Sequence, residues 1–328
     1  MEKVMIYSHK SDIDGLGCII LAKLAFGEIA YTLVSNTTEL ETKFNELYGK
    51  DVPYNSIYIT DLSLTKQTLE NIKEDAELSK KIRVFDHHIS AIKEGCNDYE
   101  FTTIIDKDSN GKKRCGTDLF YEYLTTNGYL NKTLALDEFV ELTRLEDTWE
   151  WKNDEEKGQQ AHDLAILFNS IKLDNYRKNM TKKLQNNKKR FYFTKEEIKK
   201  IRRRKQSDAL MLQKIWNDAE IFTDEFENIF AALFADYELR NELAEYARKL
   251  NIEKLKYLVI IALEKGLFGQ KSYRAIEDGF DVGSIAESHG GGGHEAAASV
   301  NITEEQKVYA LTLKKRSSLD YLVNSNYK

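Results

Sequence analysis

Val84-Phe85-Asp86-His87-His88 is the most informative stretch of the chain, because a short apolar run ends there in one acid and two imidazoles. Such a run predicts a buried strand that opens into a polar loop. Five of the six histidines of the chain lie in clusters of this kind. The other clusters are His9 with Asp12 and Asp14, and His289 with His294 on either side of four glycines. Histidines gathered around carboxylates and glycines indicate a site for metal ions and phosphate.

Strand-like and helix-like patterns alternate through the first 90 residues around this stretch. The predicted strands are 4–8, 29–34, 56–60 and 82–85, and the predicted helices are 16–26, 40–48 and 65–76. This alternation predicts a mostly parallel sheet, joined by right-handed crossovers and covered on both faces. Ligands of such sheets bind beyond the carboxyl ends of the strands. We therefore expect His9, Asp61 and Asp86, which each follow one strand, to converge there, with Asp147 joining them from the end of a helix predicted at 134–145.

The length of 328 residues suggests two domains. We predict an N-terminal domain over 1–168 that carries the first histidine and aspartate clusters, a helical basic linker over 169–218 and a smaller α/β domain over 219–328. The segment 182–205 holds twelve basic residues against two glutamates, in a chain whose net charge is -6. An acidic body argues against a protein that coats duplex DNA, whereas one cationic segment would either guide a short polyanion or form a solvated helix.

The composition, 41% hydrophobic and 31% charged, is typical of a soluble globular protein. No stretch approaches the roughly 18 apolar residues that a membrane span needs. The first residues do not form the pattern of a secretory signal. We therefore expect a cytoplasmic protein with no membrane partner. The three cysteines are odd in number and lack CxxC spacing, so they indicate neither a disulfide framework nor a thiolate zinc site.

Four carboxylates and two imidazoles are candidate metal ligands: His9, Asp12, Asp14, Asp61, His87 and Asp147. Acids crowded into one cleft repel one another unless divalent cations neutralise them or their pKa values rise. Each acid alone would more often be a helix cap or a turn residue, but the set favours a metal site. Oxygen and nitrogen ligands without thiolates suit Mn²⁺ best, then Mg²⁺ or Fe²⁺, and they also permit Zn²⁺.

The four glycines Gly290, Gly291, Gly292 and Gly293 mark either a flexible linker or a place of close backbone approach. A helix is predicted from the residues that follow, 295–298. Exposed amides before a helix N-terminus would bind a phosphate or a carboxylate. Upstream, Arg274 lies in a strand-like run and is suited to bidentate contact with phosphate.

The ordered set of motifs resembles the DHH phosphoesterase family with its DHH-associated C-terminal domain, and within it the bacterial oligoribonuclease (nanoRNase) branch. The matching positions are His9, Asp12 and Asp14, then Asp61, then Asp86-His87-His88, then Asp147, and at the far end Ser272-Tyr273-Arg274 and Gly290 to His294. The resemblance covers nearly the whole chain. It implies an α/β protein with an N-terminal parallel-sheet DHH domain, a helical linker and a smaller α/β substrate-binding domain.

The resemblance also implies roles for single residues. One metal ion would be held by His9, Asp12 and Asp61, and a second by Asp14, Asp61, His87 and Asp147. His88 would face the phosphate, Asp86 would orient the histidines, and Arg274 would neutralise developing charge, which makes these three the expected catalytic residues. The expected substrate-binding residues are Arg274, His289, Gly290, Gly291, Gly292, Gly293 and His294. His9 departs from several branches of the family, since three positions separate it from Asp12 where four are common.

The family implies a manganese-dependent phosphodiesterase with two Mn²⁺ ions, or Mg²⁺ in their place, that trims short oligoribonucleotides to mononucleotides in RNA degradation. Its substrate would be a short single-stranded RNA or a dinucleotide, and a homodimer is compatible with the sequence. Hydrolysis of a linear or cyclic dinucleotide, or of the 3′-phosphate of pAp, is the alternative within the same chemistry. The alternative of another class is a non-catalytic nucleotide-binding protein that has kept the fold.

Overall fold

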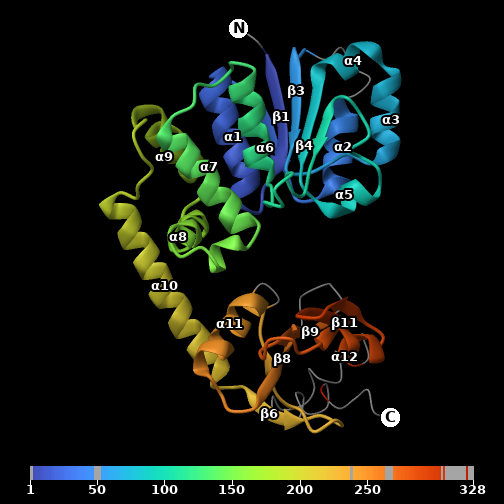
Figure 1. Ribbon diagram of the computed structural model, residues 1–328, viewed down its shortest axis with the longest axis vertical. Coiled ribbons are helices and arrows are strands. Elements are labelled where there is room, and N and C mark those ends of the chain that lie inside the picture. Colours follow the sequence, from blue (N-terminus) through green and yellow to red (C-terminus); the bar gives the residue numbers. More distant parts are fainter. Residues whose placement is uncertain are drawn as a thin grey trace. The chain divides into compact units, whose positions relative to one another are not determined.

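The computed structural model describes residues 3–47, 53–236, 239–262, 269–303, 306 and 323. The chain folds into two compact units, Met1–Arg204 and Lys205–Lys328 (Figure 1). Each unit has a sheet of its own, and helix α10 (Lys195–Trp216) runs from the first unit into the second.

The N-terminal unit is built on a five-stranded sheet in the order β2-β1-β3-β4-β5, in which the described strands all pair in parallel. Its strands are β1 (Val4–His9), β2 (Ala30–Val34), β3 (Ser56–Thr60), β4 (Ile82–Asp86) and β5 (Thr102–Ile104). Side chains alternate between the two faces of the sheet, so Val4 and Ile6 enter one core while Met5 and Tyr7 enter the other. Both cores are apolar, which explains why these strands are nearly continuous hydrophobic runs.

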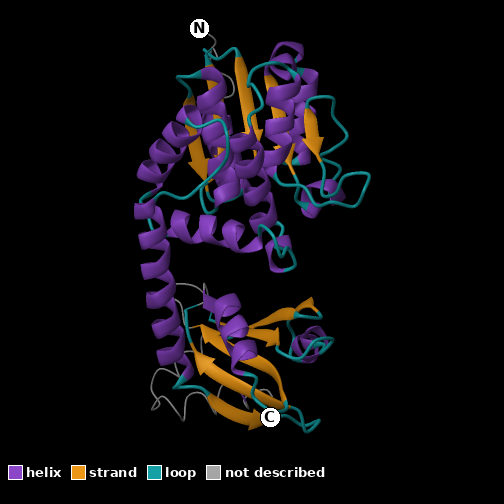
Figure 2. Cartoon of the chain, turned by 60° about the vertical axis from the view of Figure 1, so that its left-hand side comes forward, coloured by secondary structure: helices purple, strands orange, loops and turns teal. Residues whose placement is uncertain are grey.

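Helices cover both faces of this sheet (Figure 2). One face carries α1 (Ile13–Phe26), α6 (Gly116–Thr126), α7 (Leu134–Asp147), α8 (Gly158–Asn169) and α9 (Leu173–Asn186). The other face carries α2 (Thr37–Leu47), α3 (Lys66–Glu74), α4 (Ala76–Lys81) and α5 (Ile89–Lys93). A short 3-10 helix, η1 (Glu150–Lys152), follows α7 directly.

The C-terminal unit has a six-stranded sheet in the order β10-β11-β9-β8-β7-β6. Its strands are β6 (Glu220–Thr223), β7 (Ile229–Phe234), β8 (Leu255–Ala262), β9 (Gln270–Ala275), β10 (Gly292–His294) and β11 (Ala297–Asn301). Among these described strands, only β7 and β8 pair in parallel. Helix α11 (Arg240–Leu250) packs on one face and α12 (Val282–Ser288) on the other. The predicted fold class, a parallel-sheet α/β domain followed by a smaller α/β domain, is confirmed.

The packing of the chain differs from the predicted division into 1–168, 169–218 and 219–328. The segment expected to be a separate linker is helical, but its first part packs into the N-terminal unit. Tyr176, Met180 and Leu184 of α9 enter the same core as α1, because they form an apolar stripe along that helix. The boundary between the units therefore falls at Arg204, inside α10. Of the helices that the structure describes, none is long and apolar enough to cross a membrane.

Candidate metal centre

Three neighbouring strands deliver polar side chains to one edge of the N-terminal sheet. His9 is the last residue of β1, Asp86 is the last residue of β4, and Asp61 directly follows β3, which lies between them. The carboxyl ends of parallel strands meet at the same edge, so the three side chains converge there.

Two helix ends complete the cluster. Asp12 is the N-cap of α1 and accepts a hydrogen bond from the Gly15 amide, and Asp14 lies in the first turn of that helix. Asp147 is the last residue of α7. The structure thus brings together all six residues predicted as metal ligands.

The ligand atoms fall into groups that could each hold a cation. His9, Asp12 and Asp61 form one group, and Asp14, His87 and Asp147 form another, with the ligand atoms in each group within 4.8 Å of one another. A further group consists of Asp61, Asp86, His87 and His88.

Asp61 lies between the first two groups and turns one oxygen to each. Its Oδ2 is 3.7 Å from Nδ1 of His9, and its Oδ1 is 3.4 Å from Nε2 of His87. The residue is 1% exposed and has a left-handed backbone with φ of 58°. This conformation is uncommon outside glycine and costs about 1–3 kcal/mol, and strain of this kind concentrates at functional sites.

Three buried atoms of the cluster have no hydrogen-bond partner among the described residues: Asp61 Oδ2, His87 Nε2 and Asp147 Oδ2. Nε2 of His87 lies 3.4 Å from Oδ2 of Asp147 and 3.9 Å from Oδ2 of Asp14. Atoms that share one cation lie about 3 Å apart, because each bond to the cation is about 2.1 Å long. Buried polar atoms are almost always satisfied in native proteins, so the donor set fits divalent cations.

The pKa values of the clustered residues also indicate a site for divalent cations. Burial raises the pKa of the Asp61 carboxyl well above its usual value, and the neighbouring carboxylates of Asp14 and Asp12 raise it further. Burial, followed by the same two carboxylates, also raises the pKa of Asp147. The hydrogen bond with Asp12, 2.6 Å long, raises the pKa of His9. A bound cation would favour the ionised acids that burial and repulsion disfavour.

Asp86 is placed to hold the histidine pair rather than to compete for a cation. Its Oδ1 accepts hydrogen bonds from the backbone amides of His87 and His88 and lies 2.6 Å from Nδ1 of His88. The hydrogen bond with Asp86 raises the pKa of His88. The His88 side chain is 47% exposed and stands at the open side of the cluster.

Two residues that hold Asp14 were absent from the predicted site. Backbone amides of Gly116 and Thr117, at the N-terminus of α6, donate to its two oxygens at 2.7 Å each, and Oγ1 of Thr117 donates to its carbonyl at 2.6 Å. The positive end of a helix thus stabilises a fully buried carboxylate. Gly116 stands before the helical apolar pattern of residues 117–126, and this pattern is the signal that could have found the contact.

Gly116 also leaves no room for a larger residue beside Asp61. A Cβ at this position would lie 2.8 Å from the backbone nitrogen of Asp61 and 2.9 Å from its Cα. We expect Gly116→Ala to displace Asp61 and to lower turnover by roughly a hundredfold, the effect of misplacing a reacting group by about 1 Å. Steady-state kinetics would check this, with Thr125→Ala at the other end of α6 as the control. Wild-type turnover in Gly116→Ala would show that Asp61 tolerates the shift.

In the C-terminal unit, the predicted substrate residues Arg274 and His294 occupy one cross-strand row. His294 of β10 pairs with Ala297 of β11, which in turn pairs with Arg274 of β9. Residues that pair directly point to the same face of a sheet. The Arg274 guanidinium donates to Oδ1 of Asn241 at 3.1 Å and to the carbonyl of Tyr273 at 2.8 Å, which fixes its orientation.

His289 lies apart from this row. Its ring is 6.4 Å from that of Tyr273, which points to the α12 face of the sheet, whereas Arg274 contacts α11 on the opposite face. The structure therefore does not bring His289 together with Arg274.

The structure places the glycine run between the end of α12 and strand β11, where the backbone approaches its neighbours closely. The amides of Gly290 and Gly291 donate to carbonyls at the end of α12, and a Cβ on Gly291 or Gly293 would collide with β11. The helix predicted at 295–298 is wrong, because this segment forms the turn and first part of the β10–β11 hairpin. Pairing of β11 with β9 outweighs the helix propensity of its alanines.

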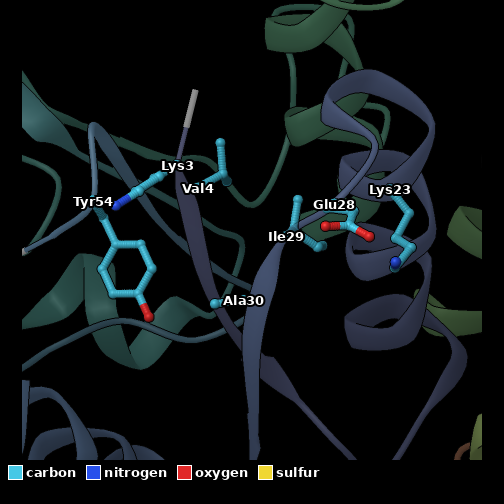
Figure 3. A pocket seen from close by; sticks show the side chains of 7 residues that line it. All are labelled: Lys3, Val4, Lys23, Glu28, Ile29, Ala30 and Tyr54. Atoms are coloured by element: carbon cyan, nitrogen blue, oxygen red, sulfur yellow. The ribbon is translucent and has the colours of Figure 1, made fainter. Parts of the chain in front are cut away.

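A cavity of about 560 Å³ lies elsewhere in the N-terminal unit (Figure 3). It is at the amino ends of β1 and β2, the opposite edge of the sheet from the histidines and acids, and so takes no part in the cluster. Its lining residues are Lys3, Val4, Lys23, Glu28, Ile29, Ala30 and Tyr54.

Comparison with known proteins gives a sequence relative and several structural ones. No family model matches the chain. The oligoribonuclease NrnB of Bacillus subtilis is 32% identical over 329 aligned positions, which cover 96% of this chain and 76% of the relative.

The pGpG-specific phosphodiesterase PggH from Vibrio cholerae is 13% identical, with a TM-score of 0.55 over 99% of this chain and 100% of that one. The DHH domain of a protein described as a member of a family of ribosomal proteins is 12% identical, with a TM-score of 0.56 over 98% of this chain and 86% of that one. The two structural likenesses show a shared fold.

Proposed function

The chain belongs to the DHH phosphoesterase family, and we propose that it is a metal-dependent exoribonuclease that hydrolyses short oligoribonucleotides to mononucleotides. The relative NrnB is named an oligoribonuclease, which supports this substrate class. The observation that carries the proposal is Asp61, whose two oxygens face two separate groups of histidine and aspartate ligands. A buried carboxylate in this position is suited to bridging a pair of divalent cations.

In this proposal His9, Asp12 and Asp61 would hold one cation, and Asp14, Asp61, His87 and Asp147 would hold the other, with Mn²⁺ as the preferred ion. A pair of such cations would polarise the scissile phosphate and supply a nucleophilic water at neutral pH. The contacts of Asp14 with α6 keep the second ligand group preorganised.

His88 and Asp86 act on the phosphate from the open side of the cluster. Asp86 orients the His88 ring through Nδ1 and favours its protonated form, in which Nε2 can donate to a phosphoryl oxygen. A donor aimed at the charge that develops in the transition state lowers the barrier without reorganisation.

The exposed basic side chains of the segment 182–205 favour a single-stranded polyanion as the substrate. Lys183 is committed to the fold, since it pairs with Glu197 and lies against the Phe191 ring. Other basic residues of the segment are exposed, namely Lys188, Lys189, Lys199, Lys200, Arg202 and Arg203. They can contact the backbone of a short oligonucleotide in a salt-dependent way.

Arg274 is proposed to bind a substrate phosphate, with His294 beside it in the same row. We expect Arg274→Ala to raise KM for oligonucleotides by about tenfold to a hundredfold with a smaller change in kcat, because a hydrogen bond to a charged group contributes about 1.5–3 kcal/mol. Arg274→Lys should recover only part of the loss, since it cannot make the bidentate contact. Lys256→Ala on the adjacent strand β8 also removes one positive charge and serves as the control. Equal KM values for Arg274→Ala and Lys256→Ala would remove Arg274 from the substrate site.

A panel of substrates tests the proposed function. The protein would be incubated with Mn²⁺ or Mg²⁺ and labelled ribo- and deoxyribonucleotides of two to ten residues, cyclic dinucleotides, pAp and pyrophosphate. We expect mononucleotides from ribonucleotides of two to five residues. Release of product from pAp or from dinucleotides alone would replace the proposal by the corresponding phosphatase or phosphodiesterase. Tight binding without any product would identify a nucleotide-binding protein.

A further inference from the structure

Trp149 is an exposed aromatic residue two positions beyond the candidate ligand Asp147. Its side chain is 49% exposed, whereas Trp151 is stacked on His162 with ring centroids 4.2 Å apart. Two residues span at most about 7 Å, so the Cα of Trp149 lies within that distance of the Cα of Asp147. The backbone of Trp149 therefore lies close to the cluster of candidate ligands and its side chain is exposed, whereas the ring of Trp151 packs on His162 of α8.

The backbone at Trp149 is strained, with φ of 62° and ψ of 8° in the left-handed region. This conformation is rare and unfavourable for a bulky residue. Glycine would adopt it freely. Strain of this kind concentrates at functional sites, which suggests a role for the ring of Trp149.

Buried contacts on both sides hold this turn in place. Arg144, 3% exposed, binds Glu141, the side chain of Glu150 and the carbonyl of Lys113. Nζ of Lys113 in turn donates to the carbonyl of Thr148 at 3.3 Å. The residues before and after Trp149 are thus fixed by one network, which makes the strained conformation rigid and presents the ring without further ordering cost.

A cation lies over this ring. Nζ of Lys152 is 4.8 Å from the centroid of Trp149, a distance typical of a cation–π contact. The exposed half of the side chain is available to a second planar group. A nucleobase is such a group, and stacking on an aromatic side chain is the usual way in which proteins hold the bases of single-stranded nucleic acids.

We propose that Trp149 is a base-stacking platform that holds a nucleobase of the substrate whose phosphate lies at the Asp61 cluster. This inference rests on the proposed function, because it takes the oligonucleotide as the ligand. The platform binds any base, since every base offers a π-face, and so it selects nucleotides over small phosphate esters without selecting a sequence.

Kinetics of Trp149→Gly and Trp149→Phe test the proposal against a structural role. Loss of stacking is worth about 1–3 kcal/mol per base, so Trp149→Gly should raise KM for a ribodinucleotide roughly fivefold to a hundredfold. KM for an abasic analogue should not change, and Trp149→Phe should restore most of the binding. Because glycine relieves the strained φ, the melting temperature of Trp149→Gly should remain close to that of the wild type. Asn251→Gly, which relieves a left-handed residue at the end of α11, is the control and should leave KM unchanged.

A binding measurement separates failure of this inference from failure of the proposed function. In a Trp151→Phe, Trp216→Phe background, adenosine monophosphate should quench the emission of Trp149, and ribose 5-phosphate should not. If the wild type hydrolyses no oligonucleotide, the proposed function fails. The quenching of Trp149 emission by adenosine monophosphate would still test whether a base stacks on this ring. Unchanged KM in Trp149→Gly, a large fall in its melting temperature, or absent quenching would each overturn the platform.

Discussion

Replacing Asp61 with asparagine is expected to lower turnover by at least about a thousandfold, because charge stabilisation by bound cations is worth several kcal/mol of the barrier. The amide of asparagine has the size of the carboxyl, and asparagine adopts the left-handed backbone found at this position, where φ is 58°. The fold should therefore persist. Asparagine cannot serve as an anionic bridge between the two ligand groups that Asp61 faces. The loss should therefore appear in kcat at saturating metal, measured on a ribodinucleotide.

The same substitution should make the metal-free protein more stable. Burial and the charges of Asp14 and Asp12 oppose ionisation of Asp61, and a neutral amide removes that repulsion. Each 1 kcal/mol gained raises the melting temperature of a domain of this size by about 2–4 °C. Asp98→Asn replaces an exposed aspartate and is the matched control. Activity within tenfold of the wild type, or a lower melting temperature without metal, would contradict a bridging role for Asp61.

Removal of divalent cations is expected to abolish turnover and to lower the melting temperature. A ligand at a hundred times its Kd stabilises the native state by about 2.7 kcal/mol, so returning Mn²⁺ to the chelated protein should produce a shift of several degrees. The shift should be absent in Asp61→Asn. Thermal unfolding and turnover would be measured after chelation and then across a titration of Mn²⁺, Mg²⁺ and Zn²⁺.

This stabilisation by cations should grow as the pH rises. The folded-state pKa values of Asp61, Asp147 and His9 are all raised, so each contributes stability at low pH that is lost as the pH rises through the raised pKa. The metal-free protein thus weakens with rising pH, whereas cation binding strengthens because it requires deprotonated ligands. Melting curves at about pH 6 and about pH 8 should give the larger Mn²⁺ shift at the higher pH. The opposite order would mean that these residues do not hold the ion.

The fold and the convergence of the cluster could be predicted from local patterns. The runs 4–8, 56–60 and 82–85 are apolar enough to be strands, and the helical patterns between them predict a mostly parallel sheet. Once the strands are parallel, His9, Asp61 and Asp86 must share an edge. The resemblance to a known family then supplied roles that no pattern in the residues could give.

The glycine run shows where local reasoning fails. The alanines after Glu295 favour a helix by propensity, but pairing with β9 turns them into β11. The end of α12 accepts the amides of Gly290 and Gly291, and it places His289 on the opposite face of the sheet from Arg274. Strand pairing depends on residues remote in the chain, and propensity carries no information about them.

The α/β class, the family and the set of acids and histidines at the sheet edge all follow from the order of residues, because strand direction depends on the order of elements along the chain. Only the tertiary structure shows which contacts hold these acids and histidines in place. Gly116 and Thr117 reach Asp14 across about a hundred positions, Asp61 divides its two oxygens between two ligand groups, and Arg144 fixes the turn that carries Trp149. Such contacts arise from packing between distant segments, and packing is set by the whole core rather than by any local run of residues.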